Sequence, residues 1–519
     1  MINSPKSMIS KNNYLQVISV FALFFMCVNI GVGQNITILP NGISPAQTGG
    51  IPKYTYEQII ALPNPQNGDL VNDITFNCLK RFDGQKWQVM YFSDDPSITL
   101  FFLNQSNQAR VYDLISDSQS NIYATGTFAG TLQFGSFSIT GYGNSEGFIG
   151  KFNSAGTCIW LKRIGGTSTS TAKAICKHIG LDSQNNIYVT GEGKGIGIFG
   201  TINLDMGTLN VGSGFGSIFT TKLNNNGTFI WAIRNNSSGN HYGYANNANK
   251  ALTDNTGNTY ITGTYEVGNE YGSTTFPVSG GVDIFLYKVN TSGTILWAKR
   301  IYGNGGDWAN DMAIDNSGNL YIVGETGSTS SFNIGSTTVN ISTSSFDKVF
   351  VVKLDNNGNS IWSKFFLSNN VFFRCNHISV INTEIFISGQ MAANSSVSFG
   401  SNSLSSSSID RYYLVKFDNN GNSINARFSS LFFNVKTIVP TNGKLKILAE
   451  NSLGTINSNL MVEYSYYLNG NTTLSGCLAP NSNFYFGGFL YSYGASKIGS
   501  HYIAPSLIPD RFMLGRVVF

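Results

Sequence analysis

The sequence has little charge and few cysteines. Asp, Glu, Lys and Arg make up only 12% of its 519 residues, with a formal net charge of +4. Strong electrostatic binding of nucleic acid requires a clustered basic surface, and we therefore expect no nucleic-acid partner. The 6 cysteines include no adjacent pair and no Cys-x-x-Cys motif, so they predict neither a disulfide framework nor a zinc site. We interpret them mainly as small buried hydrophobic residues.

Long apolar runs are missing except near the N-terminus, where one extends from Leu15 to Ile30 after Lys6 and Lys11. A basic segment, a short apolar segment and the small residues of Gly31-Val32-Gly33 are typical of a secretory signal peptide. We predict cleavage after residue 33, which leaves 30 basic and 28 acidic residues and a net charge of +2. The alternative is a membrane anchor, but its apolar core is shorter than the ~20 residues of a spanning helix. We expect a secreted protein without a later membrane span, whether extracellular, at the cell surface or periplasmic.

Glycine, aromatic and small polar residues are abundant instead. The chain contains 57 glycines and 13% aromatic residues, and 41% of it is hydrophobic. This hydrophobic fraction is enough for a folded core. Many turn residues combined with aromatic and β-branched residues favour an all-β protein.

An internal repeat organises most of the chain. One unit, residues 311–324, has the sequence Asp-Met-Ala-Ile-Asp-Asn-Ser-Gly-Asn-Leu-Tyr-Ile-Val-Gly, and its aromatic residue recurs at intervals of 65, 72, 61 and 65 residues. The aromatic positions are Tyr123, Tyr188, Tyr260, Tyr321 and Phe386. A second element follows with a recurring lysine at Lys151, Lys222, Lys288, Lys353 and Lys416 and a tryptophan at Trp160, Trp231, Trp297 and Trp362. Between the two elements lies a third echo of the type Phe-Gly-Ser, at residues 134–136, 199–201, 271–273, 334–336 and 399–401. Repeats of this kind predict a solenoid or propeller.

Each unit contains short β-branched or aromatic runs bounded by turn residues, which predicts four strands, A to D, in one blade of a β-propeller. Two degenerate units, residues 444–464 and 483–516, bring the expected count to seven blades, with six or eight left open. The last unit ends after strand C. Residues 97–103 resemble the strand D segment at 360–367, so we expect them to supply the outer strand of the last blade and close the ring, which would protect strand edges.

The two repeat elements, Asp-x-x-Gly-Asn-x-Tyr-(Ile/Val)-x-Gly and Phe-x-x-Lys-(Leu/Phe)-Asp-x-x-Gly-x-x-x-Trp, resemble the bacterial seven-bladed β-propeller repeat family over residues 97–519. The resemblance implies a secreted or cell-surface protein with a binding or structural role and no defined reaction. The sequence departs from the pattern at Asn425, which replaces the tryptophan, and in blades six and seven. Residues 34–96 stand apart as a hairpin module or linker. Within them, residues 51–92 resemble a short module of bacterial surface and fibre-type proteins, with an Asp-Gly turn before Trp87.

Two repeated features invite a ligand interpretation. Asp315, Asp355 and Asp418 each open a loop rich in Asn, Ser and Gly, but calcium loops generally offer several carboxylates. An Asx-turn is the preferred interpretation. The repeated tryptophans could stack on carbohydrate, but their fixed place in an outer strand favours packing between blades.

One set of polar residues precedes strand A of successive blades and is expected to ring one mouth of the central channel, where propellers generally bind ligands. The set, called the predicted ring below, is Asp113, His178, Lys250, Asp311, His377, Lys436 and Ser475. A merely solvated rim is the alternative. Cys176 and Cys375 lie two positions before the histidines, and a metal site there would require blades two and five to converge.

The sequence shows no Gly-x-Ser-x-Gly nucleophile motif and no sialidase-type box, so we predict no catalytic residues, no metal and no cofactor. The leading hypothesis is a non-enzymatic scaffold that binds a protein or glycan at its channel face or through the long B–C loops. One alternative is a hydrolase or lyase acting on extracellular polysaccharide, with Asp113 and Asp311 as candidate acids. Another is a purely structural component of a surface layer or adhesin.

Overall fold

The computed structural model describes residues 52–73, 78–82, 84–85, 87–89, 97–103, 109–142, 145–165, 173–194, 198–199, 209–210, 217–237, 246–266, 268–277, 279–341, 348–370, 372–407, 409–428, 435–441, 444–449, 452–467, 471–479, 484–491, 496–498, 501–503 and 511–518. The expected signal peptide, residues 1–33, lies outside the described residues. The chain divides into two compact units, residues 1–90 and 91–519. Each unit is described by itself.

The N-terminal unit is a small four-stranded sheet with one short helix. Its elements are β1 (Lys53–Tyr54), α2 (Tyr56–Ile60), β2 (Leu70–Asp73), β3 (Cys78–Phe82) and β4 (Trp87–Val89). Thr55 and Gln58 form a capping box at the start of α2, because each side chain accepts a hydrogen bond from the other's backbone N–H. The predicted hairpin is confirmed, since Phe82 pairs with Trp87 and Gly84 has a φ of +96°.

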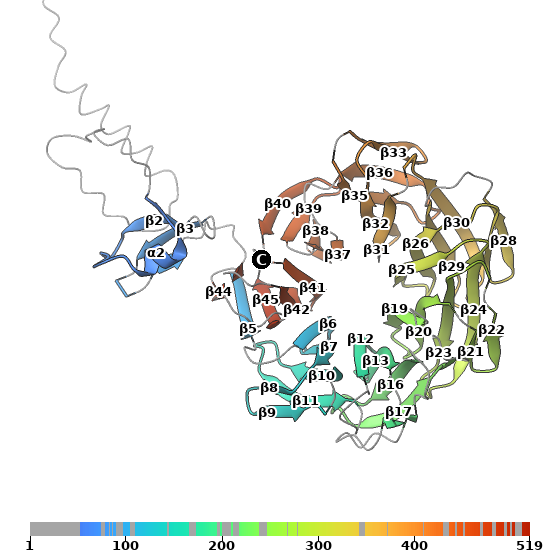
Figure 1. Cartoon of the computed structure of the whole chain (residues 1–519), viewed down its shortest axis with the longest axis horizontal. Helices are drawn as coiled ribbons and strands as arrows, with labels where there is room; N and C mark the ends of the chain where they lie inside the picture. Colours follow the sequence, from blue (N-terminus) through green and yellow to red (C-terminus); the bar gives the residue numbers. More distant parts are fainter. Residues whose placement is uncertain are drawn as a thin grey trace, which may run out of the picture. The chain divides into compact units, whose positions relative to one another are not determined.

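The second unit is a ring of antiparallel sheets around a central opening (Figure 1). In the part of this unit that the structure describes, seven blades succeed one another; six are sheets of four strands, and the third blade is part of a sheet of six. The strands of blade 1 are β6 (Ala109–Ser116), β7 (Ile122–Phe128), β10 (Glu146–Phe152) and β11 (Cys158–Ile164). Those of blade 2 are β12 (Lys173–Leu181), β13 (Ile187–Lys194), β16 (Ser217–Leu223) and β17 (Phe229–Arg234). Those of blade 3 are β19 (Asn246–Thr253), β20 (Thr259–Tyr265), β23 (Asp283–Val289) and β24 (Ile295–Gly303).

Blades 4 to 7 continue the ring in the same A to D order. The strands of blade 4 are β25 (Asp307–Ile314), β26 (Leu320–Thr326), β29 (Lys348–Leu354) and β30 (Ser360–Leu367). Those of blade 5 are β31 (Phe373–Ile381), β32 (Glu384–Met391), β35 (Arg411–Phe417) and β36 (Ser423–Phe428). Those of blade 6 are β37 (Val435–Thr441), β38 (Lys444–Ala449), β39 (Ser452–Ile456) and β40 (Val462–Tyr467). Blade 7 contains β41 (Asn471–Leu478), β42 (Phe484–Tyr491), β45 (Arg511–Val518) and β5 (Ser97–Leu103). The all-β propeller expected from the sequence is therefore confirmed.

The ring closes as predicted, with a strand from the N-terminal side of the unit. β5 pairs antiparallel with β45, in a register that places Thr99 opposite Arg516 and Leu103 opposite Met513. Blade 7 thus combines strands from the two ends of the unit, and its outermost strand comes first in the sequence. With this closure the last blade has its outer strand.

The stretches between strands B and C, which the sequence suggested were long loops, contain small hairpins. These lie at the outer part of the ring (Figure 1). Their strands are β8 (Thr131–Phe134) and β9 (Phe137–Thr140), β14 (Ile198–Phe199) and β15 (Leu209–Asn210), β21 (Asn269–Tyr271) and β22 (Thr274–Phe276), β27 (Ser331–Ile334) and β28 (Thr337–Asn340), β33 (Ser395–Phe399) and β34 (Asn402–Ser406), and β43 (Ser496–Ile498) and β44 (His501–Ile503). A further short strand, β18 (Asn236–Ser237), pairs with β21. β27 also pairs with β24, which extends the sheet of blade 3 with strands from blade 4.

The hydrophobic core lies between adjacent blades. One cluster, for example, joins Tyr321 and Val351 of blade 4 to Ile387 and Val415 of blade 5. Every residue of the B strands β7 and β20 is buried, because both faces of a central strand pack against a neighbouring blade. This double burial explains why the repeat has nearly continuous apolar runs rather than strict alternation.

Candidate functional site in the central channel

Strand A of each of the first six blades contains a β-bulge. In blade 4, Ala309 pairs with Gly324 and Asp311 pairs with Val323, so Asn310 is an extra residue outside the ladder. A bulge leaves its extra residue unpaired and re-aims the side chain. The extra residues, called the bulge residues below, are Tyr112, Lys177, Asn249, Asn310, Asn376 and Lys436. Blade 7 has regular pairing between β41 and β42.

The bulge explains the glycine that ends the repeat motif. A Cβ atom on Gly324 would lie 1.8 Å from the carbonyl oxygen of Trp308 in strand A. Such a Cβ would lie equally close to a strand A carbonyl at Gly126, Gly263 and Gly389, and 2.1 Å from one at Gly191. In blades 1 to 5 the absence of a side chain allows this close approach of two backbones. In blade 6 the same bulge forms with Ala449 at the equivalent position of strand B.

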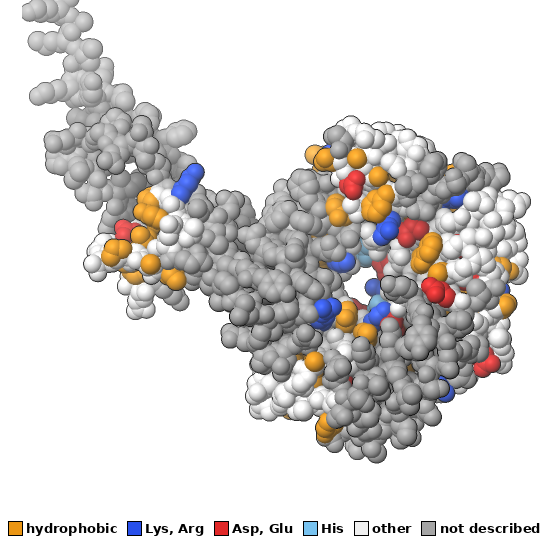
Figure 2. Space-filling model, viewed as in Figure 1, with side chains coloured by type: hydrophobic (Ala, Val, Ile, Leu, Met, Phe, Trp, Pro, Cys, Tyr) orange, Lys and Arg blue, Asp and Glu red, His pale blue; other side chains and the backbone are white. Residues whose placement is uncertain are grey.

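The bulge residues line a cavity of about 440 Å³. The residues around it are Tyr112, Lys177, His178, Ala248, Asn249, Asn310, Asn376 and Lys436. All six bulge residues are among them, one from each of blades 1 to 6. Figure 2 shows Lys or Arg, Asp or Glu and His side chains around the hollow at the centre of the ring. The volume lies in the ~300–1,000 Å³ range of sites for small ligands.

Three of the bulge residues also tie one blade to the next. Lys177 Nζ lies 3.5 Å from the carbonyl oxygen of Ala248, and Asn249 Nδ2 donates to that of Ala309 at 2.5 Å. Asn310 Nδ2 donates to the carbonyl of Cys375 at 2.8 Å. In each case the acceptor is the residue just before the bulge of the following blade. The wall of the cavity is thus a chain of inter-blade contacts that holds the bulge residues in place.

Two glutamates of strand B support this wall from behind. Glu192 Oε1 lies 2.5 Å from Lys177 Nζ and accepts the backbone N–H of Ala248 at 3.2 Å. Glu325 has the same role in blade 4, where it accepts Asn310 Nδ2 and the backbone N–H of Cys375, both at 2.9 Å. The carboxylates therefore hold the terminal nitrogen atoms of Lys177 and Asn310 in place.

Most residues of the predicted ring lie one position after the bulge residues in the sequence. Asp113, His178, Lys250, Asp311 and His377 directly follow the bulges of blades 1 to 5. In blade 6 the equivalent residue is Thr437, because Lys436 is itself the bulge residue. Of the seven predicted residues, His178 and Lys436 line the cavity. The other five predicted residues are not among those that line this cavity, and their role at the channel mouth stays a prediction.

Asp311 is the centre of a charged contact across three blades. Its Oδ1 lies 3.4 Å from Lys250 Nζ of blade 3, and its Oδ2 lies 2.7 Å from His377 Nδ1 of blade 5. Asp311 Oδ2 also accepts the backbone N–H of Ile378 at 3.0 Å. Burial acts to raise the pKa of Asp311, but the Lys250 charge and the hydrogen bond from His377 outweigh it and hold the pKa well below its usual range. The Asp311 charge in turn raises the pKa of Lys250.

Asp113 makes the corresponding contacts between blades 7, 1 and 2. It accepts a hydrogen bond from Ser475 Oγ at 3.0 Å and from the backbone N–H of Ile179 at 3.1 Å. His178 Nδ1 lies 3.9 Å away. Burial raises the pKa of Asp113. Burial, together with the charges of Lys250 and Lys177, lowers the pKa of His178 to about 3, so this imidazole is neutral at neutral pH.

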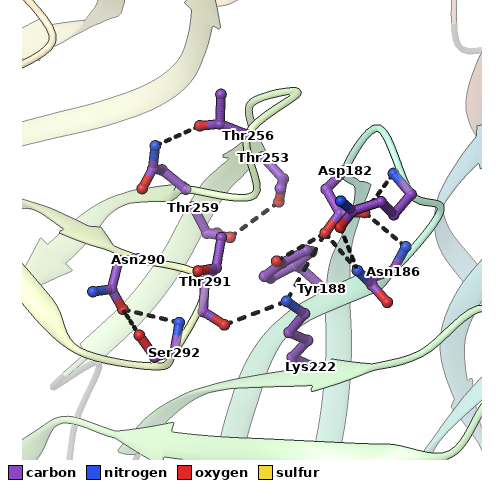
Figure 3. Close-up of polar contacts among 12 residues, drawn as sticks. Asp182, Asn186, Tyr188, Lys222, Thr253, Thr256, Thr259, Asn290, Thr291 and Ser292 are labelled. Atoms are coloured by element: carbon purple, nitrogen blue, oxygen red, sulfur yellow. Dashed lines mark hydrogen bonds and ion pairs between the residues drawn. The ribbon is translucent and has the colours of Figure 1, made fainter.

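The repeated aspartates, tyrosines and lysines form a second inter-blade contact, away from the cavity (Figure 3). In blade 2, Asp182 accepts the backbone N–H of Gln184, two residues on, at 3.0 Å, which makes its loop an Asx-turn. Asp182 also accepts Tyr188 Oη at 3.1 Å. Lys222 Nζ lies 5.0 Å from the centre of the Tyr188 ring and 3.3 Å from the carbonyl oxygen of Thr291 in blade 3. The expected Asx-turns are confirmed in the same way at Asp315, Asp355 and Asp418.

The repeated tryptophans pack between blades, as predicted, although they are only partly buried. Trp231 Nε1 donates to the Thr291 carbonyl of the next blade at 2.8 Å, and its ring lies against Gly293. Asn425, which replaces tryptophan in blade 5, keeps the polar half of this contact, since its Nδ2 donates to the Asn459 carbonyl of blade 6 at 3.0 Å. The departure from the repeat pattern therefore preserves the inter-blade hydrogen bond.

Four of the cysteines, Cys158, Cys176, Cys375 and Cys477, are free thiols. Cys158, Cys176 and Cys375 are buried, and Cys477 is partly buried, which agrees with their interpretation as small hydrophobic residues. Burial raises the pKa of the Cys176 thiol to about 12. Within the described ranges, no group of three or more His, Cys, Asp or Glu side chains has a metal-binding arrangement. Among those same residues, no helix is both long and apolar enough to cross a membrane.

The closed ring of four-stranded blades defines this protein as a β-propeller. A family model described as "Beta-propeller repeat" matches residues 159–199 and 296–333, so the repeats are similar to those of that family. No curated protein is similar to the chain in sequence.

Among solved structures, the chain is similar to BamB from Moraxella catarrhalis, with 11% identity over 88% of this chain and 95% of that one and a TM-score of 0.35. It is also similar to the Dos1 propeller, with 8% identity over 81% and 95% of the two chains and a TM-score of 0.41. A third is the extracellular domain of a putative one component system, BT4673, from B. thetaiotaomicron, with 11% identity over 86% of this chain and 50% of that one and a TM-score of 0.38. Similarity at this level concerns the fold alone.

Proposed function

We propose that this protein is a secreted or cell-surface binding scaffold that recognises a glycan or protein ligand in the cavity of the central channel. The observation that carries the proposal is the composition of the cavity wall. Six blades each contribute one residue from the same bulge position, and five of these six side chains are Asn or Lys. A concave site with convergent polar groups is the usual form of a ligand site. The N-terminal segment of residues 1–33 supports the extracellular part of the proposal.

The cavity is a better candidate than the B–C stretches. The hairpins in those stretches pair with or pack on outer strands; β27 pairs with β24, and Phe399 of β33 packs on Phe366 of β30 with ring centres 5.0 Å apart. These two hairpins are therefore held against the outer strands of the ring.

The binding proposal is also favoured over a polysaccharide hydrolase or lyase. The two candidate acids, Asp113 and Asp311, are both engaged by backbone N–H groups of the following blade. Neither is among the residues that line the cavity. Both carboxylates have inter-blade roles that a structural function explains.

Binding of purified residues 34–519 to an array of glycans and extracellular-matrix proteins tests the proposal. The informative variant is Tyr112→Ala with Lys436→Ala, because both side chains line the cavity. The matched control is Arg427→Ala, an exposed residue of the outer strand β36. We expect binding that the cavity variant loses and the control retains. Binding that both variants retain would place the site elsewhere, and the absence of any binding would favour a structural role.

A further inference from the structure

The cavity has two unlike halves, which follow from the order of the blades. Asn249, Asn310 and Asn376 come from the consecutive blades 3, 4 and 5. Lys177 and Lys436 come from blades 2 and 6, on either side of Tyr112 in blade 1 and the adjoining blade 7. One half of the wall is therefore made of amides, and the other half holds an aromatic ring between two ammonium groups.

The amide half offers hydrogen-bond acceptors. Asn249 and Asn310 use their Nδ2 atoms on the carbonyls of Ala309 and Cys375, as described above. With the nitrogen directed at the wall, the Oδ1 atom of each amide is the atom left to meet a ligand. An amide oxygen accepts hydrogen bonds from hydroxyl groups. Acceptors on successive blades suit a ligand that presents hydroxyl groups side by side.

The other half favours a negative charge. The charged residues that line the cavity are Lys177 and Lys436, and no Asp or Glu is among the lining residues. Glu192 balances Lys177 from behind, with only 2% of its side chain exposed, and Asp311 balances Lys250. Lys436 of blade 6 is the second lysine among the lining residues. A carboxylate held by an ammonium group forms a hydrogen bond about twice as strong as a neutral one.

Two uncharged groups complete the site. The Tyr112 ring supplies an apolar face beside a polar tip, which suits the C–H face of a sugar ring. His178 also lines the cavity, and its buried Nε2 atom has no hydrogen-bond partner among the described residues. Because His178 is neutral at neutral pH, it adds no positive charge to the cavity wall.

We propose that the ligand is a carboxylated sugar, a uronic-acid-type residue within a short oligosaccharide. Its carboxylate binds on the Lys177, Tyr112 and Lys436 side, and its hydroxyl groups donate to Asn249 and Asn310. This inference rests on the proposed function, since it names the ligand of the same cavity.

Isothermal titration of residues 34–519 with matched pairs of oligosaccharides tests the inference. Each pair consists of a carboxylated oligosaccharide, such as digalacturonate or a glucuronate-containing disaccharide, and the same compound with its carboxyl group reduced to an alcohol. We expect the acid of at least one pair to bind about tenfold or more tightly than its reduced form, the ratio that ~1.4 kcal/mol provides. Lys436→Gln should remove that preference, whereas Lys436→Arg should keep it. Arg427→Gln, outside the cavity, should change neither the dissociation constant of the acid nor that of its reduced form.

The outcomes separate this inference from the proposed function. Equal affinity for both members of every pair, with binding still lost in Tyr112→Ala, would overturn the carboxylate inference and leave the cavity as a glycan site. A Lys436→Gln variant that binds acid and alcohol with the wild-type ratio would overturn it too. If no carboxylated compound binds but a neutral glycan or a protein binds in the cavity, the ligand class is overturned and the proposed function stands. Unchanged thermal unfolding of each variant shows that lost binding is not lost folding.

Discussion

His377 Nδ1 of blade 5 lies 2.7 Å from Asp311 Oδ2 of blade 4, and this contact joins the innermost strands of the two blades. On the other side of Asp311, Lys250 of blade 3 lies 3.4 Å away. A single buried carboxylate thus holds three blades together directly behind the cavity wall. The stability of the ring and the shape of the cavity consequently depend on the same side chain.

Replacing this carboxylate should destabilise the propeller strongly. Asp311→Ala removes the carboxylate shared by Lys250, whose side chain is 28% exposed, and the buried His377, so we expect a cost of about 2–3 kcal/mol, between that of an exposed and that of a fully buried ion pair. The free energy of unfolding, measured by urea denaturation, should fall by that amount. Glu266→Ala, which removes an exposed acid in blade 3, is the control and should change it by less than about 0.5 kcal/mol. A loss below about 1 kcal/mol for Asp311→Ala would show that the contact does not hold the blades together.

Gly324 of strand B should not tolerate a methyl group, although blade 6 forms its bulge with Ala449 at the equivalent position. Gly324→Ala places a Cβ atom 1.8 Å from the Trp308 carbonyl, which the backbone can relieve only by moving strand A away. We expect a loss of about 3 kcal/mol or more in the free energy of unfolding. Gly327→Ala is the matched control, because its Cβ atom would meet nothing closer than 3.4 Å. Similar unfolding midpoints for the two variants would refute the link between glycine and bulge.

Asp307 should give the protein a pH-dependent stability. Burial raises its pKa to about 7, against the hydrogen bonds that it accepts from Thr326 and Ser328. The folded state therefore keeps a proton that the unfolded chain releases above its ordinary pKa of 3.8. The stabilising contribution of this group is complete below pH ~4, is lost as the pH rises toward 7, and does not change further above that.

The measurement is the free energy of unfolding of wild type and Asp307→Asn between pH 4 and pH 8. The free energy of unfolding of Asp307→Asn, relative to that of wild type, should increase as the pH rises to 7 and then stay constant. Asp355→Asn provides the control, because that aspartate lies in an exposed Asx-turn and its pKa is lowered by hydrogen bonds within the loop. A constant difference between wild type and Asp307→Asn across this range would show that Asp307 titrates normally.

The closing strand should be essential, whereas the N-terminal unit should not. A protein that begins at residue 91 retains β5 and should unfold in one cooperative transition. One that begins at residue 104 lacks β5 and leaves β45 paired on one side only, with β42. We expect the shorter protein to lose cooperativity and to aggregate, because an unpaired edge strand invites pairing with other chains. Calorimetry and light scattering compare the two, and equal behaviour would show that ring closure does not depend on β5.

The fold was predictable because the same residue types recur at matching positions of each repeat. Recurring positions such as Tyr123, Tyr188 and Tyr260 fix the strand order, and the likeness between residues 97–103 and 360–367 is enough to predict the closing strand. The hairpins between strands B and C were not predicted. Their echo, Phe-Gly-Ser, was visible, but segments as short as β14 and β15 offer too few residues for a strand pattern.

The cavity wall was missed for a different reason. A β-bulge adds one residue without changing the composition of a strand, so the count along strand A selected Asp113 and Asp311 rather than Tyr112 and Asn310. The available signal was the strand B glycine opposite a small residue, such as Gly324 opposite Ala309. In blade 6 this glycine is replaced by Ala449, and there the alignment slipped by one position to Lys436.

The pairing of β5 with β45 also bears on how a cell would make this protein. During synthesis β5 is among the first parts of the propeller to appear, and its partner β45 among the last, so the closing strand stays unpaired while all the other blades are made. An interrupted product, whichever side it lacks, cannot close and keeps an open strand edge that chaperones or proteases can recognise. Ring closure is thus possible only after the full set of blades has been made.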